Sequence, residues 1–328
     1  MTGPLLRLFD PRNEFGASVE EELEEARRAS VAYSPVPVPE RSVLLAPQSD
    51  GAAEQLVALA EPLARSEPPR ELVLARVIRP PRGAEVRGAL QTEDRLLSDT
   101  SARLAKARLE LLSRGIAARA VAFNSAHAGD DLARLAEGEE VDLVLVDGRR
   151  PLLGAGVPRG DVGTILRRAP CNVGVLVARE GERVLPGPGA AVLVPFGGAD
   201  HDWAALELGA WMASTTEAPL RLLGAAGQTD EGRDATRLLA NASLLVHQFA
   251  GVHAEPVVAP RGAGLLVIGL SERWRQEGLG TTRSEIARAA PAPILFVRRG
   301  QRTGALAPRD DVTRFSWSSP AMGLGGGR

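Results

Sequence analysis

The chain carries the same closing pattern twice. Residues 165–180 read ILRRAPCNVGVLVARE, and residues 286–299 read IARAAPAPILFVRR. Each run passes from a short basic stretch through Ala-Pro into an aliphatic, β-branched segment and ends on charged residues. Pro170 and Pro291 lie about one domain length apart in the sequence. A pattern repeated at this spacing predicts an internal duplication.

Strand and helix patterns alternate through the first copy. Apolar runs bounded by turn residues predict buried strands at 42–48, 71–78, 116–123, 141–147 and 172–178. Helical spacing of apolar residues predicts helices at 50–64, 90–114, 130–138 and 162–169. Strands that alternate with helices predict an α/β fold with a doubly wound parallel sheet.

The second copy follows the same order with one omission. We expect strands at 190–196, 219–226, 252–259, 265–270 and 293–299, and helices at 202–214, 231–251 and 284–290. Residues 260–264 join the third strand directly to the fourth, which is too short for a crossover helix. The second domain is therefore trimmed there, or one of these two strand assignments is wrong.

These patterns divide the chain into two α/β domains with extensions. We expect an N-terminal helix and Pro-rich connector at 1–41, a first domain at 42–180, a linker at 181–189, a second domain at 190–300 and a flexible tail at 301–328.

Composition excludes several classes of protein. A net charge of −2 gives no reason to expect nucleic-acid binding, and one cysteine, Cys171, excludes an internal disulfide framework. The four histidines lack the spacing of metal ligands, and no nucleophile or Walker motif occurs. We therefore expect no metal site, no catalytic residues and no enzyme activity.

Both copies resemble universal stress protein domains. That family ends with Ala-Pro-Cys-Pro-Val before its last strand, and residues 169–173 and 290–294 read APCNV and APAPI. The resemblance implies two tandem doubly wound domains of the adenine nucleotide alpha hydrolase-like type and a site for ATP or another adenine nucleotide. It also implies pairing through the fifth strands, so we expect 172–178 and 293–298 to pair antiparallel.

The resemblance places the nucleotide on two degraded glycine-rich loops. The family pattern is Gly-x2-Gly-x9-Gly-Ser/Thr, whose backbone N–H groups hold phosphate. Gly269 begins this loop in the second half and Gly280-Thr281 closes it, with Glu272 at the second glycine. In the first half the loop begins at Gly148 and ends at Gly160, where the following acidic residue would repel phosphate.

The adenosine end of each site is altered as well. The family aspartate after the first strand falls on Gln48 in the first half and on Gly197 in the second, where only Gly198 keeps the next glycine. If one site binds a nucleotide, we expect it to be the second. The alternative is that both loops are relics that serve packing. Trp274, in the second loop, either stacks on a base or anchors the loop.

The N-terminal residues suggest an attachment. The run MTGPLLRLFDPRN resembles the last turn of the membrane domain in bacterial cation:proton antiporters of the monovalent cation:proton antiporter family 2, several of which carry stress-protein-like cytosolic tails. This resemblance implies a regulatory domain on the cytoplasmic side of the membrane, whose partners are the antiporter's membrane domain and a second copy of the chain. The alternative is a free, cytoplasmic tandem stress protein that binds ATP.

Overall fold

The computed structural model describes residues 39–79, 86–148, 158–179, 181–224, 230–257, 262–279 and 281–301. Side chains are described throughout these ranges except at 86–92, 230–235, 277 and 281–282. The predicted N-terminal helix, nearly all of the Pro-rich connector and the C-terminal tail lie outside the described residues. No described helix is long and apolar enough to cross a membrane.

The first half, residues 41–179, alternates strands and helices as predicted. Its elements are β1 (Arg41–Leu45), α2 (Asp50–Ala64), β2 (Arg70–Ile78), α3 (Val86–Ser113), β3 (Ala118–Asn124), α4 (Ala128–Gly138), β4 (Leu143–Asp147), α5 (Gly160–Arg168) and β5 (Asn172–Val177). Helix α3 begins at Val86, four residues before the predicted start at residue 90.

The second half, residues 190–301, repeats this order. Its elements are β6 (Ala191–Pro195), α6 (Asp200–Thr216), β7 (Leu220–Leu223), α7 (Asp230–Ala250), β8 (Ala254–Val257), β9 (Ala263–Leu270), α8 (Trp274–Glu277), α9 (Thr281–Ala289) and β10 (Ile294–Arg298). The short helix α8 was not predicted, because the polar sequence around Trp274 has no helical periodicity over a single turn.

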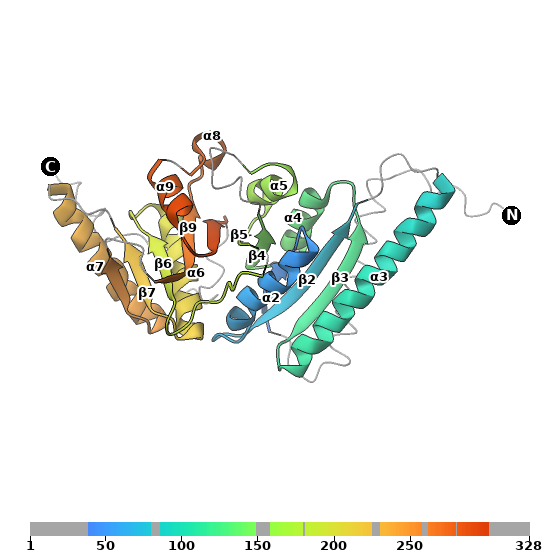
Figure 1. Ribbon diagram of the computed structural model, residues 1–328, viewed down its shortest axis with the longest axis horizontal. Coiled ribbons are helices and arrows are strands. Elements are labelled where there is room, and N and C mark those ends of the chain that lie inside the picture. The colour runs from blue at the N-terminus through green and yellow to red at the C-terminus, as the bar shows by residue number, and fades with distance from the viewer. Residues whose placement is uncertain are drawn as a thin grey trace.

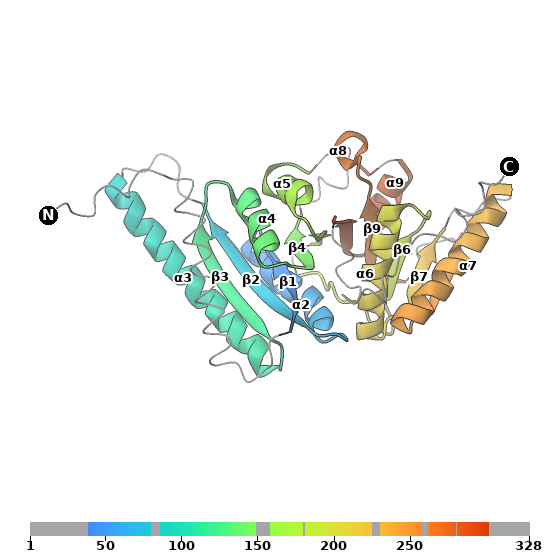
Figure 2. The ribbon, with the colours of Figure 1, turned by 180° about the vertical axis from the view of Figure 1, so that it is seen from behind.

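The two halves form one ten-stranded sheet of order β3-β2-β1-β4-β5-β10-β9-β6-β7-β8. Every strand pair is parallel except the central pair, where β5 and β10 run antiparallel with Val175 opposite Phe296. The predicted pairing of the two closing strands is therefore confirmed, and it explains why the pattern occurs twice. We call this central pair the seam. Helices α3 and α7 lie at opposite ends of the molecule (Figures 1 and 2).

Alternate residues of the strands fill two hydrophobic cores, one on each face of the sheet. Val43 and Leu45 of β1 face the core that contains side chains of α2, α3, α6 and α7. Leu44 of the same strand faces the other core, which α4, α5, α8 and α9 share. Each core contains residues of both halves, so the seam lies inside continuous hydrophobic packing.

The connection from β8 to β9 is short, as expected. Both strands are present and parallel to their neighbours, with only residues 258–262 between them. The strand assignments are therefore correct, and the second half has no counterpart of α4 between these two strands. Pro256 lies in β8, the last strand of the sheet, where a missing N–H is tolerated and hinders further pairing.

Candidate functional site

Ligands of open α/β sheets bind at the carboxyl ends of the parallel strands. The candidate site of the first half lies where β1 and β4 end, and that of the second half where β6 and β9 end. Because the seam is antiparallel, the carboxyl ends of the two halves point toward opposite edges of the sheet.

A carboxylate of the chain itself lies at the first-half site. Asp147, the last residue of β4, accepts a hydrogen bond from the Gln48 backbone N–H at 2.5 Å through Oδ1. Its Oδ2 accepts one from the Ser49 hydroxyl at 3.0 Å. The backbone donor that follows β1 is thus already bound by a carboxylate of the chain. Asp147 places negative charge where the resemblance placed a nucleotide.

The two predicted glycines of this half have different environments. Gly148 follows β4 and donates its N–H to the Leu176 carbonyl at 2.7 Å, which extends the sheet. Gly160 begins α5 with φ of +64°, and a Cβ built on it would meet nothing within 4 Å. Asp161 follows and forms an ion pair with Arg79. The start of α5 is therefore open but acidic, which does not fit a bound phosphate.

A second internal carboxylate organises the second-half site. Asp202 is fully buried in the first turn of α6. Its Oδ2 accepts hydrogen bonds from the backbone N–H groups of Gly197 at 3.0 Å and Ala199 at 3.2 Å. Its Oδ1 accepts one from Nη2 of Arg283 at 2.7 Å. Asp202 therefore connects the end of β6 to the first turn of α9.

Two predicted glycines of the second half serve close packing. A Cβ on Gly198 would lie 2.6 Å from Cδ2 of Leu238 in α7. A Cβ on Gly269 would lie 2.2 Å from the backbone oxygen of His201, at the start of α6. Gly269 lies within β9 and not in the loop that was predicted to begin there. At both positions the absence of a side chain lets a helix approach the strand end.

The closing Gly-Thr is only partly placed. Gly280 lies outside the described residues, and Thr281 begins α9 with an undescribed side chain. The helix nevertheless begins at the position that a phosphate-binding Gly-Thr would require. Arg283 lies in its first turn and is already paired with Asp202.

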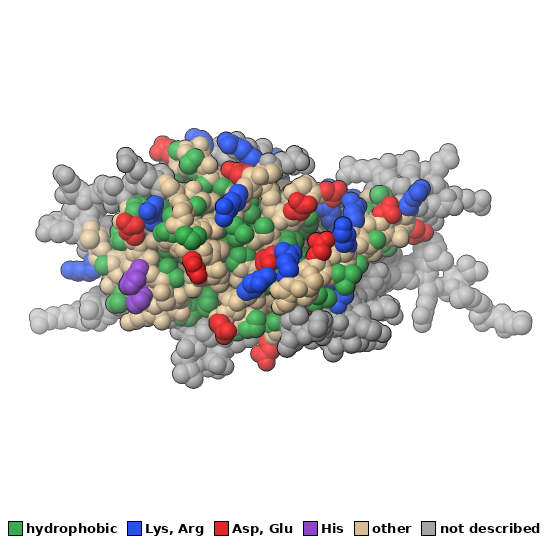
Figure 3. Space-filling view, turned by 60° about the horizontal axis from the view of Figure 1, so that its bottom comes forward, with side chains coloured by type: hydrophobic (Ala, Val, Ile, Leu, Met, Phe, Trp, Pro, Cys, Tyr) green, Lys and Arg blue, Asp and Glu red, His purple; other side chains and the backbone are tan. Residues whose placement is uncertain are grey.

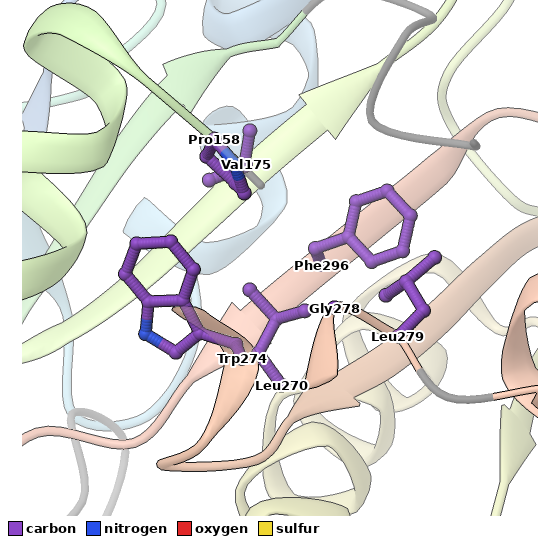
Figure 4. Close-up of a pocket in the computed structure, with 7 residues that line it drawn as sticks. All are labelled: Pro158, Val175, Leu270, Trp274, Gly278, Leu279 and Phe296. Carbon is purple, nitrogen blue, oxygen red and sulfur yellow. The ribbon is translucent and has the colours of Figure 1, made fainter. Parts of the chain in front are cut away.

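Trp274 lies in an apolar pocket over the seam (Figure 4). The pocket has an empty volume of about 300 Å³, which includes the part open to solvent. It is lined by Pro158, Val175, Leu270, Trp274, Gly278, Leu279 and Phe296. Trp274 is 5% exposed, so the loop-anchor interpretation fits its burial. The pocket receives side chains from both halves.

Sequence reasoning missed the two carboxylates that organise the sites. Asp147 ends an apolar strand and Asp202 stands third in a helix, positions at which a carboxylate often serves capping. Nothing in the sequence showed that each would bind the backbone after the first strand of its half.

Among the described residues no group of three metal-binding side chains exists, and the ring centroids of His247 and His253 stack 4.0 Å apart. Figure 3 shows acidic and basic side chains interspersed on one face.

Comparisons with known proteins add evidence on the fold. No protein-family model and no curated protein matches the sequence. Among solved structures, the chain is similar to a universal stress protein from Archaeoglobus fulgidus DSM 4304, with a TM-score of 0.54, 13% identity, and coverage of 79% of this chain and 98% of that one. The fold is that of tandem universal stress protein domains.

Two further structures extend this comparison. A putative universal stress protein from Pseudomonas aeruginosa UCBPP-PA14 gives a TM-score of 0.50 at 18% identity and covers 79% of this chain and 93% of its own. A universal stress protein in complex with cAMP gives a TM-score of 0.31 at 19% identity, with 43% of this chain and 97% of that one covered. The likenesses to the Archaeoglobus fulgidus and Pseudomonas aeruginosa structures establish the universal stress protein fold alone and leave the ligand open, and the likeness to the cAMP complex adds no argument.

Proposed function

We propose that this chain is the cytosolic regulatory domain of a cation:proton antiporter and modulates monovalent cation/proton exchange without catalysing a reaction. One structural observation carries the non-catalytic part of this proposal. In both halves the backbone N–H groups after the first strand are bound by a carboxylate of the chain, Asp147 or Asp202. The antiporter part is supported by the sequence at residues 1–13, which lie outside the described residues.

A fused pair of stress-protein domains suits such a role. A regulatory domain acts through an equilibrium between two states that a signal biases. The seam and the shared cores couple the two halves, so a change at one site has a physical route to the other. Through this route a signal received in the second half would reach the segment that precedes β1.

The test is truncation in the full-length transporter. Deleting everything after residue 17 of this chain should leave a membrane domain that folds and transports, but with a changed pH or ion activation profile. Transport is measured in vesicles that contain equal amounts of intact or truncated protein. Identical profiles would refute the regulatory role. A gene without hydrophobic spans upstream would refute the antiporter assignment and support the free tandem stress protein.

Binding of an adenine nucleotide such as ATP in the second half is the second candidate. It is favoured by the start of α9 at Thr281, directly after Gly280, with Arg283 in the first turn. The first half does not fit an adenine nucleotide as it stands, because Asp147 lies at the adenosine end and Asp161 at the closing end of the phosphate loop.

Calorimetry with ATP on the parent chain and on Gly280→Asp tests this candidate. Binding that the substitution weakens would support the second site. Equal affinity in both proteins would exclude that site, and no heat in the parent at millimolar ATP would support loops that serve packing.

A further inference from the structure

His201 lies buried beside the contact between α6 and α9. Its side chain is 16% exposed, and its Nε2 is buried without a hydrogen-bond partner among the described residues. This nitrogen lies 3.5 Å from Oδ1 of Asp202, the same oxygen that accepts the hydrogen bond from Arg283. Two side chains able to carry positive charge therefore face one carboxylate oxygen.

The contact that they share is the link between the two helices. Asp202 is fully buried, and its other oxygen already accepts the N–H groups of Gly197 and Ala199. Arg283 is the described cation that joins α9 to this carboxylate. Leu279, shortly before α9, lines the pocket over the seam together with Trp274. A weaker ion pair between Asp202 and Arg283 would therefore also loosen the wall of that pocket at Leu279.

The charges around His201 come from each neighbouring element. Asp200 and Asp202 lie on α6, Glu272 lies in the turn before α8, and Arg283 lies on α9. Burial lowers the pKa of His201, while Asp202 opposes this shift and Arg283 adds to it. Asp200 is itself 84% exposed and faces Arg299 at 3.5 Å, so its effect is screened by solvent.

The direction of the pH effect follows from this lowered pKa. The unfolded chain takes up a proton at the ordinary imidazole pKa of about 6.5, and the folded chain resists it until a lower pH. The unfolded state therefore binds more protons in this window. The stability that neutral His201 contributes is fully present above about pH 6.5 and is lost as pH falls through the pKa of His201 in the folded chain. Acid thus weakens the structure around His201.

We propose that His201 is a proton-responsive joint between α6 and α9. A protonated His201 competes with Arg283 for Oδ1 of Asp202 and repels its guanidinium, which loosens α9 and the pocket wall before it. The inference concerns the second half of this chain alone. It does not depend on attachment to a membrane domain, so its failure and that of the antiporter proposal are distinguishable.

Hydrogen exchange at two pH values tests the joint. After correction for intrinsic exchange rates, lowering pH from about 7.5 to about 5.5 should raise exchange in 284–289 of α9 by about three- to tenfold relative to α2. His201→Gln, which cannot be protonated, should abolish the increase. His127→Gln, at an exposed histidine, is the matched control and should keep it. No acid effect in the parent, or the same effect in His201→Gln, would overturn the proposal.

A titration of the unmodified chain covers the case in which His201→Gln does not fold. The imidazole proton resonances of the four histidines are followed by NMR over the same range. His201 is assigned as the resonance that remains in each of His127→Gln, His247→Gln and His253→Gln. The His201 midpoint should lie below about 6.5 in the parent and rise in Arg283→Gln, which removes the repelling cation. A midpoint at or above 6.5 in the parent would contradict the joint.

Discussion

Arg70 is a buried cation of the first half that contacts the second half. It begins β2, is fully buried, and lies with Cζ 5.3 Å from the ring centroid of Trp211 in α6. Its Nη1 also donates to the Pro68 carbonyl at 3.0 Å and to the Ser66 hydroxyl. Burial and then the nearby Arg41 lower its pKa to about 10, while Asp142 and Glu207 oppose this.

We expect Arg70→Met to destabilise the chain strongly. The substitution removes the charge that Asp142 and Glu207 face in a buried region, a change that typically costs about 3–5 kcal/mol. Urea unfolding measures the loss. The control is Arg65→Met, at an exposed arginine that pairs i,i+4 with the half-buried Glu61, which should cost less than about 1 kcal/mol. Equal losses in both variants would show that Arg70 is not specially stabilising.

Gly269 distinguishes packing from phosphate binding. A Cβ there would overlap the His201 backbone, which cannot move away as a flexible side chain can. Gly269→Ala should therefore lower the free energy of unfolding by about 1–3 kcal/mol, as measured by urea unfolding. Gly138→Ala, in an α4 position with open space, should change stability by less than about 1 kcal/mol. An unchanged stability for Gly269→Ala would contradict the packing role and support a role of Gly269 in phosphate binding.

The same residues show how far sequence reasoning reached at this scale. Gly148, Gly198 and Gly269 lie at or shortly after strand ends, whereas Gly160 begins α5. The motif did not predict the close packing at Gly198 and Gly269, since close approach of Leu238 or of the His201 backbone depends on helix placement, which the sequence pattern does not define.

At the scale of elements, periodicity predicted the ten strands and the order of the long helices. Their apolar runs reflect burial on both faces of a parallel sheet, which leaves a clear signal. The seam was predicted from the repeated ending together with the pairing known for the family. The one-turn helix α8 was missed, since its burial depends on a single anchor, Trp274, that packs across the seam.

The seam itself should hold two separate chains together. Insertion of a protease site between Pro188 and Gly189, both exposed, would allow the linker to be cut after folding. Because β5 and β10 pair over five residues inside two cores, the cut halves should elute together in gel filtration. Phe296→Asp, which places a charge opposite Val175, should release the halves after cutting. Separation of the cut parent would contradict the seam's role.

At the scale of the whole molecule, the continuous sheet predicts one cooperative unit. Every tryptophan of the chain lies after the linker, at positions 203, 211, 274 and 317. Fluorescence therefore reports the second half and its boundary with the first half, because Trp211 lies against Arg70 and Trp274 lines the pocket over the seam. Far-ultraviolet circular dichroism reports both halves. If the seam and the shared cores couple the halves, the two signals should give the same midpoint in urea.

A core substitution in the first half makes this test decisive. Leu56 in α2 is fully buried in the core that both halves share. Leu56→Ala should cost about 2–5 kcal/mol and should lower the fluorescence midpoint as much as the circular dichroism midpoint, although every tryptophan is in the other half. The exposed Leu109→Ala is the matched control and should leave both midpoints nearly unchanged. A fluorescence midpoint that stays in place while circular dichroism becomes biphasic would show two independent domains, and the coupling on which the regulatory proposal depends would then be absent.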